Sequence, residues 1–208
     1  MLPTLEVRWF FPGPLPAAAA AWFDGLGEPV EEEARTDRYL VPTEGDALGV
    51  KVREGRIEAK QRTARAEASA WGRATARPET WRKWSFELAA DEGEALDDAW
   101  TEVAKARRQR WLQFDGAVCA LEISTVRCDG DAWWSVCLET AGERAADRQR
   151  ALHGAAARWL DRADAPALPQ AAAQGYPAWL RDRASPEPSD APSAGTPSAE
   201  GPAGTSGR

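Results

Sequence analysis

Hydrophobic and polar residues alternate with a period of two along much of the chain, a pattern typical of strands with one apolar and one polar face. The alternation is clearest in residues 48–63, LGVKVREGRIEAKQRT, where two such runs meet at Glu54-Gly55 and predict a hairpin. The charged residues of both runs share the faces opposite their apolar neighbours: Lys51, Arg53, Glu58, Lys60 and Arg62. Two interpretations remain open, a solvated surface or a polar interior that meets an anion.

The same alternation predicts further strands over residues 5–11, 34–42, 80–88, 117–126 and 132–140. Residues 100–114 are rich in Ala, Lys, Arg and Gln, which also suit a helix on the solvated surface. We favour a strand because Lys105 and Arg107 then share a face, and because Asp115-Gly116 is a strong hairpin turn.

Helices are predicted from Pro16 to the break at Gly25, from about Gly142 to Leu160, and in the GYPAWL segment, residues 175–180. Three connecting segments are expected between the regular elements. They are an acidic loop over residues 29–33, a helix-prone link over residues 64–70, and a loop or helical turn over residues 91–98.

The final segment, residues 184–208, consists mainly of Pro, Ser, Gly, Ala and Thr and has no large apolar residue. Such a segment buries too little apolar surface to order itself, so we expect a disordered tail. The folded domain then spans residues 1–183. Its seven or eight antiparallel strands, joined mostly by hairpins, predict an α+β fold in which the strands close into a β-barrel flanked by helices.

Composition excludes several classes of function. The chain is 43% hydrophobic and 28% charged, with a formal net charge of −7, which argues against general nucleic-acid binding and against a polybasic membrane patch. No run approaches membrane-spanning length, and the first residues lack the apolar stretch of a signal peptide. The odd number of cysteines, Cys119, Cys128 and Cys137, favours reduced thiols and a cytoplasmic location, and their spacing lacks the close pairs of structural zinc sites.

Several predicted strands carry charge on one alternating face and Val, Leu, Ile or Trp on the other. If the apolar faces pack outward against the helices, the charged faces converge inside the barrel. Buried ions need partners, so such an interior either forms an internal salt-bridge network or binds a charged ligand. A polyphosphate on Lys and Arg, with Mg²⁺ on carboxylates, is the ligand chemistry that suits both signs of charge.

The order of these segments resembles the CYTH domain of the triphosphate tunnel metalloenzyme superfamily. The likeness lies in EVRWF, DRYL, the hairpin LGVKVREGRIEAKQR, WRKWSF, EVAKARR, CALEI, VCLET and GYPAWL, and it covers roughly residues 4–181. The resemblance implies a closed antiparallel eight-stranded tunnel in which basic residues hold a triphosphate and glutamates bind Mg²⁺ or Mn²⁺. Members include inorganic, thiamine and RNA 5′-triphosphatases and class IV adenylyl cyclases.

Carried over position by position, the resemblance predicts six phosphate-binding residues: Lys51, Arg53, Lys60, Arg62, Lys105 and Arg107. It predicts Glu6, Glu122 and Glu139 as metal ligands. The first strand departs from the Glu-x-Glu-x-Lys pattern of the family, since Arg8 replaces the second Glu and Phe10 replaces the Lys. An arginine there repels a divalent cation.

Two functions follow from the resemblance and from the departure of the first strand from the family pattern. The leading prediction is binding of a triphosphate-containing small molecule or inorganic polyphosphate, with hydrolysis that depends on Mg²⁺ or Mn²⁺. The alternative is a non-catalytic polyphosphate-binding module with the same fold.

Overall fold

The computed structural model describes residues 2–88 and 99–184. Two predicted segments, the link over residues 91–98 and the tail that follows residue 184, lie outside the described residues.

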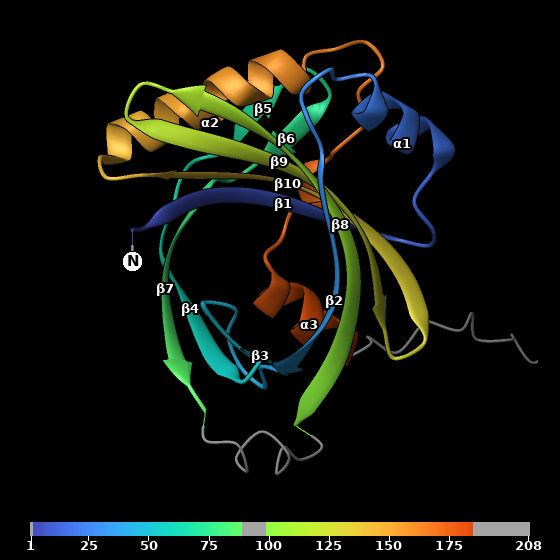
Figure 1. The fold of residues 1–208 in the computed structure, drawn as a ribbon, viewed down its shortest axis with the longest axis vertical. Helices are drawn as coiled ribbons and strands as arrows, with labels where there is room; N and C mark the ends of the chain where they lie inside the picture. Colours follow the sequence, from blue (N-terminus) through green and yellow to red (C-terminus); the bar gives the residue numbers. More distant parts are fainter. Residues whose placement is uncertain (1, 89–98, 185–208) are drawn as a thin grey trace, which may run out of the picture.

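Eight antiparallel strands form a closed barrel (Figure 1). In order around the barrel they are β1 (Thr4–Pro12), β10 (Asp131–Gly142), β9 (Ala117–Cys128), β8 (Trp100–Phe114), β2 (Glu31–Leu40), β3 (Leu48–Arg53), β4 (Arg56–Arg65) and β7 (Glu79–Glu87). The pairing of β7 with β1, from Thr4–Trp81 to Glu6–Glu79, closes the ring and leaves no free sheet edge. The closed barrel confirms the predicted fold class and the tunnel architecture that the resemblance implies, and residues 100–114 are a strand.

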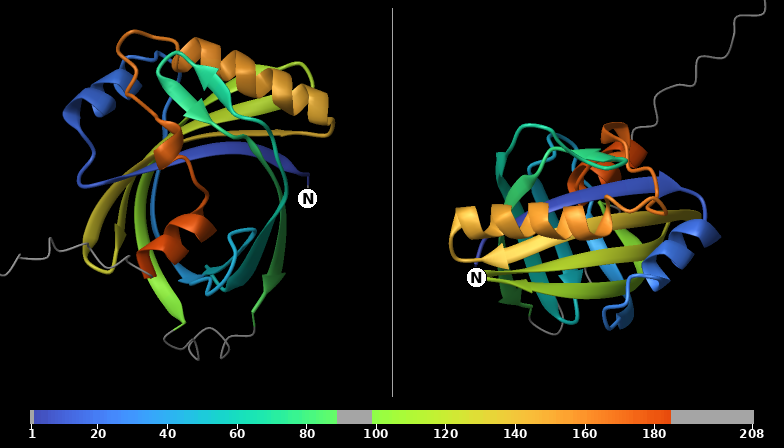
Figure 2. Two further views of the ribbon diagram at one scale, coloured as in Figure 1. Left: turned by 180° about the vertical axis from the view of Figure 1, so that it is seen from behind. Right: turned by 90° about the horizontal axis from the view of Figure 1, so that it is seen from above.

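The helices lie outside the ring or across its end. Helix α1 (Ala17–Asp24) and helix α2 (Ala145–Trp159) pack on the outer face, with α2 running across β9 and β10 (Figures 1 and 2). Beside them lies a small hairpin of β5 (Ser69–Trp71) and β6 (Ala74–Ala76). After a short 3₁₀ turn (Gln170–Ala172), helix α3 (Tyr176–Ala184) lies across one end of the barrel (Figure 2).

The main hydrophobic core lies between the outer face of the barrel and these helices. Along β1 the outward residues Leu5, Val7 and Trp9 are buried against α1 and α2. Each large apolar side chain buried in this way stabilises the fold by about 1.5–3 kcal/mol. Since successive side chains of a strand point to opposite sides, this packing directs Glu6 and Arg8 into the barrel.

Two connecting segments and the start of one helix differ from the sequence predictions. Strand β2 begins at Glu31, within the predicted acidic loop, because Glu31–Glu33 pair with β8. The predicted helix-prone link is largely strand: β4 continues to Arg65, which pairs with Glu79 of β7, and β5 begins at Ser69. Helix α2 begins at Ala145 because β10 continues to Gly142. In each case cross-strand pairing outweighs local composition.

The three cysteines are buried and form no disulfide. In the part of the chain that the structure describes, the helices are too short or too polar to cross a membrane.

Candidate anion-binding site

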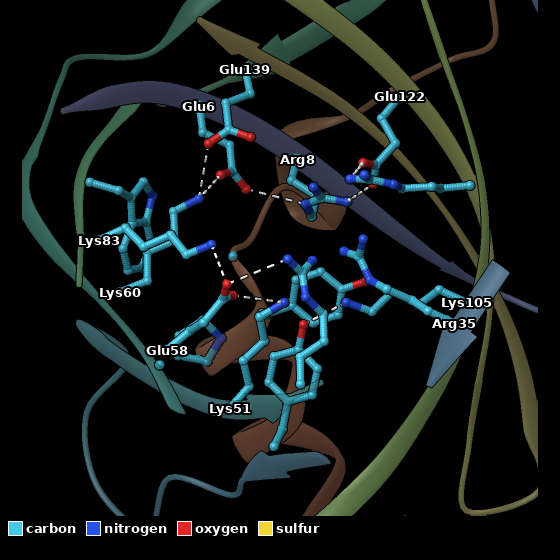
Figure 3. Close-up of a pocket in the computed structure, with 18 residues that line it drawn as sticks. Glu6, Arg8, Arg35, Lys51, Glu58, Lys60, Lys83, Lys105, Glu122 and Glu139 are labelled. Atoms are coloured by element: carbon cyan, nitrogen blue, oxygen red, sulfur yellow. Dashed lines mark hydrogen bonds and ion pairs between the residues drawn. The ribbon is translucent and has the colours of Figure 1, made fainter. Parts of the chain in front are cut away.

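The interior of the barrel, which we call the lumen, contains a cavity of about 200 Å³ to which all eight barrel strands contribute (Figure 3). Eight basic side chains and four carboxylates line it, so the lining has a surplus of four positive charges. The charged lining residues are Glu6, Arg8, Arg35, Lys51, Arg53, Glu58, Lys60, Lys83, Lys105, Arg107, Glu122 and Glu139. The charged strand faces therefore converge, as the alternation predicts.

Most of the predicted site residues meet in this cavity. Five of the six predicted phosphate-binding residues line it, as do the three predicted metal ligands. Arg62 does not belong to the lining: its guanidinium is bound by Asp46 and by Glu79, with Nη1 3.0 Å from Glu79 Oε1. Sequence analysis did not assign Arg35 or Lys83 to the site, although both lie on alternating charged faces.

One group of ion pairs joins β1 to the neighbouring strands. Arg8 lies between Glu6 and Glu122, with Nε 3.2 Å from Glu6 Oε1 and Nη1 2.9 Å from Glu122 Oε1. Lys60 contacts the other oxygen of Glu6 and lies 3.3 Å from Glu139 Oε1 (Figure 3). Burial alone would raise the pKa of Glu122, but the Arg8 guanidinium lowers it to about 2. Glu122 therefore stays ionised at neutral pH.

A second group surrounds Asp37, whose side chain is 0% exposed. Its Oδ2 lies 3.1 Å from Lys51 Nζ, 3.2 Å from Lys105 Nζ and 3.3 Å from Arg35 Nε. Although burial would raise its pKa, these three cations lower the pKa of Asp37 to about 2. One carboxylate thus holds together three basic side chains that would otherwise repel one another.

Glu58, on β4, holds a third group of basic side chains in a similar way. Its carboxylate lies 2.6 Å from Lys83 Nζ, 3.2 Å from Lys51 Nζ and 3.6 Å from Arg53 Nη2. Lys51 therefore bridges Asp37 and Glu58 and lies at the junction of the two groups (Figure 3).

Lys105 is a buried cation of the lumen whose pKa is strongly lowered. Burial lowers its pKa to about 7; Asp37 opposes this shift, whereas the nearby Lys51 and Arg8 reinforce it. The Lys105 ammonium also donates to Tyr39 Oη and lies 4.0 Å from the ring centroid of Tyr176. A bound anion would favour the protonated form of Lys105. Anion binding near neutral pH should therefore be accompanied by uptake of a proton by Lys105.

This coupling predicts opposite pH dependences for stability and for anion binding. Between about pH 7 and 10.5 the unfolded chain holds a Lys105 proton that the folded chain has lost, so the free energy of unfolding rises with pH. Affinity for an anion should instead fall about tenfold per pH unit above 7, since binding then requires protonation. Calorimetry in buffers of different ionisation enthalpy measures the proton uptake. A Lys105→Arg variant, charged at every pH, should lack this dependence; equal profiles in both proteins would contradict the assignment.

The start of α3 completes the cavity with a side chain that sequence analysis did not assign to the site. Tyr176 stacks on Tyr39, with ring centroids 5.2 Å apart, and its ring lies 5.1 Å from the Arg8 guanidinium. Its hydroxyl is buried and has no hydrogen-bond partner within the described residues. Trp81 Nε1, from the opposite wall, is also a buried donor without a partner there. Unpaired buried donors cost free energy, and a phosphate oxygen is an acceptor that would relieve that cost.

The three predicted metal ligands do not fit a divalent cation in this arrangement. The Arg8 guanidinium separates Glu6 from Glu122, and the Lys60 ammonium occupies the space between Glu6 and Glu139. Within residues 2–88 and 99–184, no three His, Cys, Asp or Glu side chains are grouped to hold a metal ion. A cation there would lie against two fixed positive charges.

Comparison with known proteins finds similarity among solved structures. No family model matches the sequence, and no curated protein matches it. Among solved structures, the fold is similar to that of the Pct1 RNA triphosphatase of S. pombe, with a TM-score of 0.40 and 13% sequence identity. The alignment covers 88% of this chain and 79% of that one.

Proposed function

We propose that the lumen binds a short polyphosphate, either inorganic or as the triphosphate group of a small molecule. The observation that carries the proposal is the excess of basic over acidic side chains, eight against four, in the lining of a cavity to which all eight strands contribute. Phosphate oxygens accept charge-assisted hydrogen bonds from Lys and Arg, and these bonds are stronger in an enclosed site than in water. Lys51, Arg53, Lys60, Lys105 and Arg107 would donate them, together with Arg35 and Lys83.

The size of the cavity favours a ligand without a large organic group inside. At about 200 Å³ it is smaller than the pockets of roughly 300–1,000 Å³ that enclose drug-sized ligands. An inorganic tripolyphosphate therefore suits the lumen better than a whole nucleotide does. Any organic group would remain at the open end of the barrel.

Thermal unfolding with a series of phosphate chains tests this function. Phosphate, pyrophosphate, tripolyphosphate and ATP are compared at equal ionic strength. At a hundredfold excess over Kd, tripolyphosphate should stabilise the fold by about 2.7 kcal/mol. For a domain of this size the gain corresponds to an unfolding temperature higher by about 5–10 °C. Inorganic phosphate at the same concentration should change it much less. No stabilisation by any member of the series would contradict polyphosphate binding.

Removal of the Tyr176 hydroxyl should have two effects of opposite sign. In the free protein, Tyr176→Phe should preserve or raise stability because a buried hydroxyl without a partner is removed. Affinity for tripolyphosphate should fall by about tenfold or more, since a hydrogen bond to a charged acceptor contributes about 1.5–3 kcal/mol. Thermal unfolding with and without ligand measures both. Thr4→Val, which removes another unpartnered buried hydroxyl outside the cavity, is the matched control and should leave affinity unchanged.

Hydrolysis of the bound triphosphate is the second candidate function. It is favoured by the carboxylates Glu6, Glu122 and Glu139, which line the same cavity as the basic residues. Arg8 and Lys60 pair with these carboxylates and would have to give way to a metal ion. Phosphate release from tripolyphosphate, thiamine triphosphate and ATP, measured with Mg²⁺ or Mn²⁺, tests this candidate. Binding without release would favour the non-catalytic module.

A further inference from the structure

Arg8 occupies the position between two carboxylates where the resemblance would place a divalent cation. Its guanidinium is 8% exposed and contacts Glu6, Glu122 and the hydroxyl of Ser135. Its partners come from two other strands of the barrel, β9 and β10, as well as from β1 itself. Arg8 therefore lies within the lumen wall and is not a solvated side chain that could swing aside (Figure 3).

Lys60 provides a second positive charge, on the other side of Glu6 from Arg8. Its ammonium contacts Glu6 and Glu139, so each of the three carboxylates predicted to bind metal is paired with Arg8, with Lys60 or with both. Burial would lower the pKa of Lys60, but Glu139 and Glu6 raise it above its ordinary value. Lys60 stays charged at neutral pH, and an arginine does not lose its proton in proteins. To enter, a divalent cation would have to displace charges that the fold itself holds in place.

We propose that Arg8 and Lys60 take the place of a divalent cation in this lumen, so that polyphosphate binds without metal. The two side chains pair with Glu6, Glu122 and Glu139 as a cation would, and Lys60 receives the anion together with Lys51, Arg53 and Lys83 of the same cavity. The part that concerns the anion rests on the proposed function; the part that concerns the metal does not. Added Mg²⁺ should then compete for free polyphosphate and weaken binding, the opposite of a metal-dependent site.

Calorimetry on the full chain separates these two parts. Mn²⁺ alone should give no binding to the wild-type protein up to millimolar concentration. Tripolyphosphate should bind in EDTA, and excess Mg²⁺ should lower its apparent affinity. Micromolar Mn²⁺ binding, or anion binding only when metal is present, would overturn the inference and leave anion binding intact. If the wild-type protein binds neither Mn²⁺ nor tripolyphosphate under any condition, the proposed function is overturned and the inference about the metal stands.

Charge reversal at Arg8 tests the metal part without the anion. Arg8→Glu puts a third carboxylate beside Glu6 and Glu122 and should bind Mn²⁺ at least tenfold more tightly than the wild type. Electron paramagnetic resonance of free Mn²⁺ measures this binding. Arg8→Gln removes the positive charge without adding a ligand and should gain much less. Arg82→Glu, the same change at an exposed position on β7, should gain nothing.

Stability provides a second readout, because Arg8→Glu removes the ion pairs of Arg8 with Glu6 and Glu122, adds a third carboxylate beside them and so destabilises the fold in EDTA. Mn²⁺ should raise the unfolding temperature, or the refolding yield, of this variant and not of Arg82→Glu. If Mn²⁺ neither binds to nor stabilises Arg8→Glu, Arg8 does not hold the place of a cation.

Discussion

Replacing Asp37 with Asn should destabilise the free protein by about 3 kcal/mol, the lower end of the range for a broken buried ion pair. The loss is large because Asp37 is fully buried and holds Lys51, Lys105 and Arg35 within 3.3 Å of one oxygen. It remains at the lower end because Lys105, whose pKa is about 7, can lose its proton once Asp37 is neutral. Chemical denaturation at pH 7 measures the change.

The same Asp37→Asn variant should bind tripolyphosphate more tightly, by about tenfold, when binding is measured at a pH low enough to keep Lys105 protonated, because the lumen then gains one net positive charge near the anion. Ligand should therefore recover most of the lost stability. Asp24→Asn is the matched control: Asp24 is exposed and pairs with Arg108, so its loss should cost at most about 1 kcal/mol and leave affinity unchanged. Weaker anion binding by Asp37→Asn would contradict an anion site beside Lys51 and Lys105.

Replacing Lys60 with Ala should weaken tripolyphosphate binding by roughly 10- to 100-fold, corresponding to the loss of a charged hydrogen bond worth about 1.5–3 kcal/mol. The fold should survive this change. Glu6 retains Arg8 as a partner, and the Glu139 side chain, 37% exposed, can be solvated by water. Calorimetry measures the affinity, and thermal unfolding of the free variant measures the stability.

Arg62→Ala provides the comparison for Lys60→Ala. Both residues lie on β4 and share one face of it, but Arg62 binds Asp46 and Glu79 and does not line the cavity. Arg62→Ala should therefore change affinity by less than about threefold, as expected for a distant charge in salt solution. Equal losses of affinity in both variants would show that Arg62 binds the anion, as the sequence analysis predicts.

The alternation in the sequence predicted the barrel strands and the inward faces of β1, β3, β4, β8, β9 and β10. It did so because a period-two pattern determines which side chains share a face once the apolar face is packed. For that reason the sequence alone placed Lys51, Lys60 and Lys105 on the inward faces of their strands, and all three line the cavity.

The partners that set the chemistry of the lumen could not be predicted in this way. Asp37 lies on β2, whose acidic start resembles a loop, and its contacts with Lys105 and Lys51 depend on how the ring of strands closes. Tyr176 enters the cavity from α3, far along the chain from Lys105 and Arg8. Arg8 shares a face with Glu6 by alternation, but its contact with Glu122 needs the register of β1, β10 and β9.

The most direct test of polyphosphate binding in the lumen is a calorimetric titration of tripolyphosphate into the full chain, with Lys60→Ala measured beside it. We expect one binding site per chain, an affinity that falls as salt is raised, and a loss of at least tenfold in Lys60→Ala. No heat and no saturation at millimolar ligand, or binding that Lys60→Ala leaves unchanged, would contradict binding in the lumen.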